Sequence, residues 1–299
     1  MKVLILGAGV YGQALGQVLV DNAHEISFYD PFARKISIDA PGNIIIHSEL
    51  TQALSTVPEI IVLCTPSNTV KDLLPDLPTG IPLIVASKGI LDASIFNEFD
   101  YMVLSGAGFA EDIIKRKETR LTATDGRIVE LFTTDYLTFD ETSDAKGVLL
   151  CGALKNIYAL GAGLRDLTPK TDDWEGYIKS ATHEMEQILT INDAKPETLQ
   201  LSCGVSDLVL TCGPRSRNYS YGKRLHDEVK SGSRTIDSNN LSIGGANGDD
   251  VNEHGSNVNT NTTVEGLSAI VEIRNGVIKL PEDLPVLSWI NNQLKEGAR

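Results

Sequence analysis

A glycine-rich turn between a predicted strand and a predicted helix constrains the fold of this chain most strongly. Residues 2–6 read KVLIL, a β-rich run, and GAGVYG follows directly before apolar residues at helical spacing in 13–20. Such glycines permit a tight turn, a close approach to a pyrophosphate, and close helix–strand packing. We therefore predict a dinucleotide-binding turn at Gly7, Gly9 and Gly12. Val10 and Tyr11 lie within this turn, and the first amides of the helix that follows would face the phosphates.

Further β-rich runs follow and alternate with helical patterns. They lie at residues 25–29, 43–47, 59–64, 82–87, 101–105 and 120–123. Alternating strands and helices favour a parallel, doubly wound sheet. The strand pattern fades after residue 139. We expect an α/β fold, with an N-terminal Rossmann-type sheet in residues 1–142 followed by an all-helical domain in residues 143–299.

The run at 25–29 ends at Asp30, which is about where an acidic residue meets the ribose of NAD in such folds. The basic residues Arg34 and Lys35 follow a turn later, so NADP remains an alternative. Asp30 and Pro31 could equally form a simple turn. The sequence does not decide between NAD and NADP.

Three strand-end loops carry residues suited to ligand binding, because ligands of these sheets sit beyond the carboxyl ends of the strands. They read TPSN at 65–68, SKG at 87–89 and SGAGFA at 105–110. Lys88 is a functional candidate, since it places a cation beside a permissive glycine. A solvated loop lysine is the alternative interpretation.

The stretch at 147–164, GVLLCGALKNIYALGAGL, predicts a helix that is apolar on nearly every side and therefore buried. Lys155 is its single cation. A buried ammonium loses hydration and can serve as a general acid or base near neutral pH. The alternative is a lysine at the edge of the apolar face, with its head group in water.

The rest of the second half contains helical patterns, a basic cluster and a polar segment. Residues 172–191, 263–276 and 284–294 have helical spacing. GPRSRNYSYGKR at 213–224 gathers cations in an otherwise acidic protein and would suit a phosphomonoester. A solvated basic turn is the alternative. Residues 231–262 are rich in Ser, Asn, Gly and Asp, and we expect a mobile surface insertion there.

Composition excludes several classes of function. A formal net charge of −14 over 299 residues argues against a nucleic-acid-binding protein. The four cysteines form no CxxC pair and the five histidines lack metal-ligand spacing, so we expect reduced thiols and no metal site. We find no signal-peptide pattern and no uninterrupted apolar stretch long enough for a membrane span, and we expect a cytoplasmic protein. The oligomeric state stays open, with a homodimer as one alternative.

Seven blocks, taken in this order, resemble the NAD(P)-dependent glycerol-3-phosphate dehydrogenases of the bacterial type. They are GAGVYG at 7–12, SKGI at 87–90, SGAGFA at 105–110, ALKNIYALGAG at 153–163, GVSDLVLTC at 204–212, SRNYSYG at 216–222 and VEG at 264–266. The resemblance implies reversible reduction of dihydroxyacetone phosphate to sn-glycerol 3-phosphate, which supplies glycerophospholipid synthesis. It also implies NAD or NADP as cofactor and an active site between the two domains.

The resemblance also assigns roles to residues at matching positions. Lys155 becomes the general acid/base, Asp207 the acidic partner in the catalytic group, and Lys88 a contact to both substrate and cofactor. The other substrate contacts implied are Gly106, Gly108, Ser216, Arg217 and Asn218, with Arg217 also near the cofactor. The other cofactor contacts implied are Ala110 and Glu265, besides the glycine turn and Asp30.

This chain departs from the family pattern at three places. Ala107 and Gly108 stand where the family usually has Pro and then Ser or Thr, and Val10-Tyr11 replaces the usual Ser-Tyr pair. The polar segment is longer than usual. Gly108 leaves open a related dehydrogenase of another small hydroxy acid or phosphorylated ketone. A catalytically silent dinucleotide sensor is the second alternative.

Overall fold

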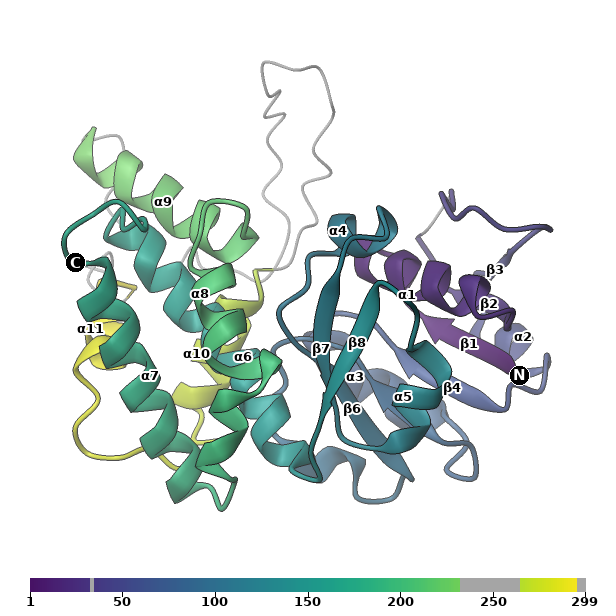
Figure 1. The fold of residues 1–299 in the computed structure, drawn as a ribbon. Helices are drawn as coiled ribbons and strands as arrows, with labels where there is room; N and C mark the ends of the chain where they lie inside the picture. The colour runs from purple at the N-terminus through teal and green to yellow at the C-terminus, as the bar shows by residue number, and fades with distance from the viewer. Residues whose placement is uncertain (33–34, 232–263, 295–299) are drawn as a thin grey trace.

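The computed structural model describes residues 1–32, 35–231 and 264–294. Arg34, and the polar segment expected at 231–262 apart from Ser231, lie outside the described residues. Two parts lie side by side, a twisted sheet flanked by helices and a cluster of helices (Figure 1).

Among the described residues, eight strands form one sheet in the order β3-β2-β1-β4-β5-β6-β7-β8. Their bounds are β1 Lys2–Leu6, β2 Glu25–Tyr29, β3 Ile45–His47, β4 Ile60–Leu63, β5 Leu83–Val85, β6 Tyr101–Ser105, β7 Thr119–Ala123 and β8 Leu137–Glu141. The doubly wound arrangement is confirmed, because the strand order runs outward from β1 in both directions, and every neighbouring pair is parallel except one. That exception corrects the expected all-parallel sheet: β7 runs antiparallel to β6. The edge strand β8 was not expected, since its five residues lack a continuous apolar run and end in two acidic residues.

Helices cover both faces of the sheet because successive side chains of a strand point to opposite sides. Val3 and Ile5 of β1 face a core shared with α1 (Val10–Asp21), α4 (Ala110–Ile114) and α5 (Gly126–Phe132). Leu4 and Leu6 face the other core, which contains residues of α2 (Leu50–Leu54), α3 (Ser67–Leu73) and the 3-10 turns η1 (Leu74–Asp76) and η2 (Ala93–Phe96). That second core continues into the helical part, so one apolar interior joins the two halves.

The helical half is built around α6, which spans Ala145–Leu164. Every residue from Gly147 to Leu164 is buried. Asp144 caps the helix by accepting a hydrogen bond from the Gly147 amide at 3.0 Å. Around α6 lie α7 (Trp174–Ile191), α8 (Asp207–Thr211), α9 (Arg217–Lys230), α10 (Glu265–Arg274) and α11 (Pro285–Gln293), with the short turns η3 (Pro196–Gln200) and η4 (Ser202–Ser206) (Figure 1). The helices expected at 172–191, 263–276 and 284–294 are present with slightly shorter bounds.

The length of α6 corrects one expectation. By length and composition alone this helix could cross a membrane, whereas no segment of that kind was expected. All of its most apolar window is buried inside the protein. Its apolar surface is thus covered by the neighbouring helices and the sheet, as in the core helix of a globular fold.

Candidate active site

The side chains of Lys155 and Asp207 form an ion pair enclosed in the protein. The Lys155 ammonium donates a hydrogen bond to Asp207 Oδ2, and each side chain is only 2% exposed. Lys155 lies on α6 and Asp207 is the first residue of α8, so residues far apart in the sequence meet here. The interpretation of Lys155 as a lysine with its head group in water is therefore wrong.

A distorted turn brings Asp207 to this position. The residues of η4 form a π-type turn, inside which Gly204 has non-helical dihedral angles of φ −93° and ψ −119°. A Cβ at Gly204 would lie 2.2 Å from the carbonyl oxygen of Leu199, so only glycine fits. Thr211 then donates its hydroxyl to Asp207 Oδ1 at 3.2 Å from one turn later on α8. Sequence reasoning missed Thr211, although its spacing of four residues from Asp207 on a helix was the available signal.

Lys88 follows β5 and faces the same group of charges. Gly89 beside it adopts φ +84°, the left-handed conformation that glycine accepts readily. Burial is the largest cause that lowers the pKa of Lys88, and the charge of Lys155 is the next. Asp207 and Glu265 act in the opposite direction, and the resulting pKa is about 8. Lys88 is half-buried, and the charges of Lys155, Asp207 and Glu265 act on its ammonium, so the interpretation of Lys88 as a freely solvated loop lysine does not fit the structure.

Arg217 and Asn218 begin α9 and meet Glu265 at the start of α10. Arg217 Nη2 lies 2.7 Å from Glu265 Oε1. The Asn218 amide donates to Asn156 Oδ1 at 3.0 Å, and its oxygen accepts the Gly266 amide at 2.9 Å. Asn156 is the neighbour of Lys155 on α6, so this network joins three helices beside the Lys155–Asp207 pair. The role of Asn156 was not assigned from the sequence.

The loop before α9 connects the two halves of the molecule. Ser216 is the N-cap of α9, and its hydroxyl accepts the Tyr219 amide at 3.4 Å. Arg215 reaches across to the sheet half: it lies 2.8 Å from Asp112 Oδ2, and its guanidinium carbon is 4.1 Å from the centre of the Phe109 ring. The basic stretch is therefore paired rather than freely solvated at Arg215 and Arg217.

The SGAGFA loop connects β6 to α4. Its start adjoins α6, since a Cβ at Gly152 would lie 3.2 Å from the Ser105 hydroxyl. Gly106 adopts φ +144°, and a Cβ there would lie 2.9 Å from Leu121 Cα. A Cβ at Gly108 would lie 2.9 Å from the Thr119 methyl group, so any side chain here would point at β7. Ala110 begins α4 and is half-buried. No contact joins Gly108 or Ala110 to the Lys155–Asp207 pair among the interactions of the described residues.

The glycine turn has the geometry that a dinucleotide requires. Gly7 adopts φ +103°, and a Cβ at Gly12 would lie 2.0 Å from the Gly7 carbonyl oxygen. A Cβ at Gly9 would meet nothing within 4 Å, so open space lies beside this backbone. Gly9 precedes α1 and no side chain caps the helix, which leaves its first amides for a ligand. Val10, the first residue of α1, is 62% exposed.

Asp30 lies at the end of β2 and contacts the glycine turn directly. Its Oδ2 accepts the Ala8 amide at 2.9 Å, and its Oδ1 accepts the Phe32 amide at 2.9 Å. The second bond closes a local turn, as one interpretation of Asp30-Pro31 predicted. The first bond fixes Asp30 at the edge of the candidate dinucleotide site, which keeps the ribose interpretation compatible with the geometry.

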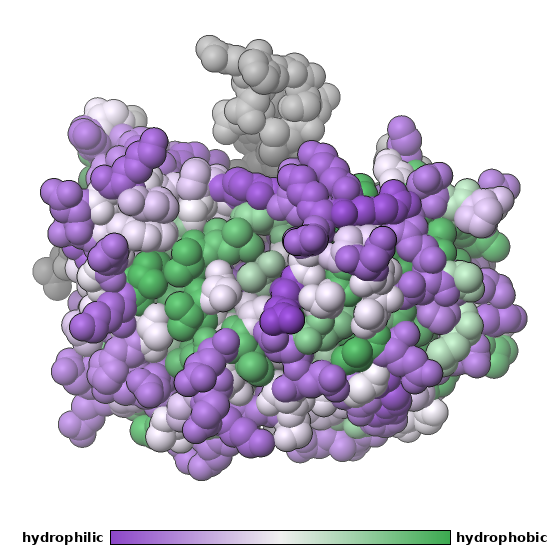
Figure 2. All heavy atoms as spheres, viewed as in Figure 1, coloured by the Kyte–Doolittle hydropathy of each residue, from purple (hydrophilic) through white to green (hydrophobic). Residues whose placement is uncertain are grey.

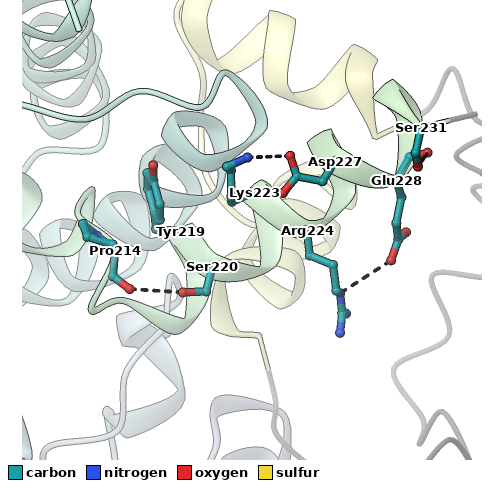
Figure 3. Close-up of a pocket in the computed structure, with 8 residues that line it drawn as sticks. All are labelled: Pro214, Tyr219, Ser220, Lys223, Arg224, Asp227, Glu228 and Ser231. Atoms are coloured by element: carbon teal, nitrogen blue, oxygen red, sulfur yellow. Dashed lines mark hydrogen bonds and ion pairs between the residues drawn. The ribbon is translucent and has the colours of Figure 1, made fainter. Parts of the chain in front are cut away.

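Two surface hollows formed by described residues contain none of the candidate site residues named above. A pocket of about 590 Å³ lies along α9. Its side chains pair with one another, for example Arg224 with Glu228 (Figure 3). A groove of about 500 Å³ runs along α7 and η4 and includes Trp174 and Val205. Figure 2 shows hydrophobic residues gathered on the helical side of the face that it draws. Within the described ranges, no group of three His, Cys, Asp or Glu side chains could hold a metal ion.

Comparison with known proteins gives a consistent result. Residues 144–299 match the family model described as NAD-dependent glycerol-3-phosphate dehydrogenase C-terminus. The chain is 30% identical over 266 residues to glycerol-3-phosphate dehydrogenase (NAD(P)+) of Leptospira biflexa, covering 75% of this chain and 79% of that protein. It is 32% identical over 264 residues to the protein of the same name from Geobacter sp. strain M21, covering 75% and 78%.

A solved structure of similar fold comes from Coxiella burnetii. This crystal structure of a glycerol-3-phosphate dehydrogenase superposes with a TM-score of 0.75 at 20% identity, covering 98% of this chain and 94% of that chain. At this identity the likeness concerns the fold, and it extends over both the sheet and the helical half.

Proposed function

Since this chain belongs to the NAD-dependent glycerol-3-phosphate dehydrogenase family, we propose that it reversibly reduces dihydroxyacetone phosphate to sn-glycerol 3-phosphate with NADH or NADPH. The observation that carries this proposal is the enclosed pair of Lys155 and Asp207, with Lys88 and Arg217 close enough to influence one another electrostatically. A proton donor, an anion site and a dinucleotide turn are the parts that the reaction needs.

Reduction of a ketone places negative charge on its oxygen, and Lys155 is the group that donates a proton there. Asp207 orients the ammonium of Lys155, and Thr211 orients Asp207. Lys88 adds positive charge to the same region. When bound, the nicotinamide dinucleotide supplies the hydride.

The phosphate of the substrate would bind at the start of α9. Ser216, Arg217 and Asn218 lie together there, and the guanidinium of Arg217 can pair with two phosphate oxygens at once. In this arrangement the carbonyl is held at a fixed distance from Lys155, which supplies the positioning part of catalysis. Gly106 and Gly108 would contribute backbone contacts to the substrate from the SGAGFA loop.

The dinucleotide would bind along the carboxyl edge of the sheet. Gly7, Gly9 and Gly12 would cradle the pyrophosphate, with the amides of Val10 and Tyr11 at the helix start. The open space beside Gly9 fits a phosphate at this position. Asp30 would meet the adenosine ribose, and Lys88, Ala110, Arg217 and Glu265 would line the nicotinamide end.

The remaining expectations belong to the same proposal. The domain boundary at 142/143 falls between the end of β8 at Glu141 and the start of α6 at Ala145. A cytoplasmic protein that supplies glycerophospholipid synthesis fits the reaction. A homodimer remains one alternative for the oligomeric state, which size-exclusion chromatography with light scattering would decide.

Steady-state oxidation of NADH and of NADPH tests the function directly. We expect turnover with dihydroxyacetone phosphate and little or none with unphosphorylated ketones or keto acids. Equal rates with unphosphorylated substrates would favour the related hydroxy-acid dehydrogenase. Tight cofactor binding without turnover on any substrate would favour the silent sensor.

A further inference from the structure

The aromatic ring of Tyr11 makes a contact that the glycine turn does not require. Tyr11 is the second residue of α1, and the Lys88 ammonium lies 4.6 Å from the centre of its ring. An ammonium within about 6 Å of a ring centre is attracted by the negative face of the ring. Phosphate binding by the turn needs its glycines and backbone amides only. The Tyr11 ring packs on the core beneath α1, and neither role requires its contact with Lys88.

The ring contact matters for Lys88 because the charged groups around its ammonium have opposite effects that largely cancel. Lys155 on α6 and Arg217 on α9 bring like charge, whereas Asp207 on α8 and Glu265 on α10 bring opposite charge. The Cys64 thiol after β4 also faces Lys88, and burial keeps it protonated by raising its pKa to about 12. Burial lowers the pKa of Lys88 further, to about 8. The Lys88 ammonium therefore begins to lose its proton only slightly above neutral pH.

The hydroxyl group of Tyr11 does not explain the contact. It is buried and has no hydrogen-bond partner among the described residues. Burial first, then the nearby Cys64 and Asp207, raise the pKa of Tyr11, so the phenol stays neutral and forms no ion pair with Lys88. The face of the ring is the part of Tyr11 that remains to interact with the ammonium.

We propose that Tyr11 is a positioning residue, whose ring face holds the Lys88 ammonium charged and in place beside Lys155 and Asp207. The proposal rests on the function above only in that a charged Lys88 serves catalysis there. The contact itself is a property of the folded chain and can be measured without turnover.

Competitive acetylation of lysines with acetic anhydride, followed by mass spectrometry across pH 6 to 10, reports the titration midpoint of each amine. We expect the Lys88 midpoint in Tyr11→Leu to fall by about half a pH unit, the value of an ordinary cation–π contact. Tyr11→Phe keeps the ring and should match the wild type, and Tyr11→Trp should match or exceed it. The exposed Lys115 in the same digest serves as the internal reference.

An unchanged midpoint in a folded Tyr11→Leu protein would overturn the proposal. So would an equal shift in Tyr11→Phe, because the hydroxyl would then be responsible. Thermal unfolding checks that each variant folds, and Tyr11→Met is the second ring-free variant should leucine prevent folding. Turnover at pH 7 and pH 9 is measured in parallel. A wild-type protein that does not reduce dihydroxyacetone phosphate would contradict the proposed function, but it would not affect the acetylation result.

Discussion

The enclosed Lys155–Asp207 pair is proposed to act in catalysis, and the same pair affects the stability of the fold. Two charges taken out of water depend on each other, and removing one leaves the other buried and uncompensated. Lys155→Met should therefore lower kcat by about 100-fold or more. It should also lower the free energy of unfolding by about 3 kcal/mol, because Asp207 is left buried without its partner. Turnover assays and urea unfolding of the same preparations measure both effects.

The double variant Lys155→Met with Asp207→Leu separates the two roles. Replacing both charges with apolar groups should restore most of the lost stability while leaving the protein inactive. A double variant no more stable than Lys155→Met would show that the destabilisation does not come from an orphaned Asp207. Near-full turnover in Lys155→Met would remove Lys155 from its proposed role.

Arg217 offers a test of the phosphate site that spares the chemical step. Arg217→Ala should raise KM for dihydroxyacetone phosphate by about tenfold or more, the usual loss for a hydrogen bond between charged groups. Its kcat should change much less, because Lys155 and Asp207 remain in place. Arg224→Ala is the matched control, since Arg224 lies on the same helix and pairs with Glu228. A similar KM in both variants would contradict the assignment.

Lys88 should give the reaction an alkaline limit. Its pKa of about 8 means that the ammonium is charged below this pH and neutral above it. We expect kcat/KM for dihydroxyacetone phosphate to fall as pH rises through about 8. In Lys88→Arg the residual activity should lack this limb, because a guanidinium keeps its charge. A rate–pH profile of the two proteins checks the expectation.

The same lowered pKa has an opposite effect on stability. An unfolded lysine keeps its proton up to its ordinary pKa of 10.5, so between pH 8 and 10.5 the unfolded chain binds more protons than the folded one at Lys88. The contribution of Lys88 to the free energy of unfolding therefore rises with pH across this window. We therefore expect activity to fall above pH 8 while the protein stays folded, which urea unfolding at each pH would check.

The crossing of α6 and α9 depends on glycine at the contact. A Cβ at Gly163 would lie 2.1 Å from the Tyr219 carbonyl oxygen, and a Cβ at Gly222 would lie 2.2 Å from the Leu160 carbonyl oxygen. Both obstacles are backbone atoms, which cannot move aside as a flexible side chain can. Gly163→Ala or Gly222→Ala should therefore lower the free energy of unfolding by about 2 kcal/mol or more. Urea unfolding measures this loss.

Gly176 on α7 provides the control for this prediction. A Cβ there would meet nothing within 4 Å, so Gly176→Ala adds only helix propensity. We expect this variant to gain about 0.5 to 1 kcal/mol. Destabilisation of the same size at all three glycines would mean that the close crossing is not the cause.

The elements that the sequence predicted best are those whose pattern is local. The strand before the glycine turn, the long apolar helix and the amphipathic helix at 172–191 follow from spacing alone. The strand β8 was missed because its outer residues are polar. The turn of the chain at Gly204 was also missed, because a π-type turn has no periodic sequence pattern. Local patterns also gave no sign that β7 would run antiparallel to β6.

The sequence predicted which residues belong to the candidate site, but not which of their side chains are in contact. Lys155 and Asp207 lie 52 positions apart, and nothing in either local pattern states that they touch. The same holds for the contact of the Tyr11 ring with Lys88, which joins the first helix to the loop after the fifth strand. Such contacts depend on how the two halves pack together, and only the folded chain reveals them.

Two groups of ion pairs between described residues join the sheet half to the helical half, in addition to hydrogen bonds such as that between Thr122 and Ser202. Arg215 pairs with Asp112 and stacks on Phe109 of the SGAGFA loop, as described above. The second group is a single ion pair, in which the Lys71 ammonium of α3 lies 3.6 Å from the Glu272 carboxylate of α10. Only the Arg215 contact lies next to the residues proposed to hold the substrate phosphate, so it can couple phosphate binding to the position of the SGAGFA loop.

Arg215→Ala should therefore lower kcat/KM for dihydroxyacetone phosphate by about threefold to tenfold, although Arg215 itself is not proposed to touch substrate. Since an exposed ion pair weakens with salt, the wild type should lose part of its advantage over Arg215→Ala between 50 mM and 500 mM salt. Lys71→Ala removes the other pair and should leave kcat/KM near the wild-type value. Hydrogen exchange at residues 105–112 should quicken in Arg215→Ala and stay unchanged in Lys71→Ala. Equal kcat/KM values and equal hydrogen exchange in the two variants would contradict this coupling. The Arg215 contact would then only stabilise the interface between the two halves, and the glycines of the SGAGFA loop would fix its conformation.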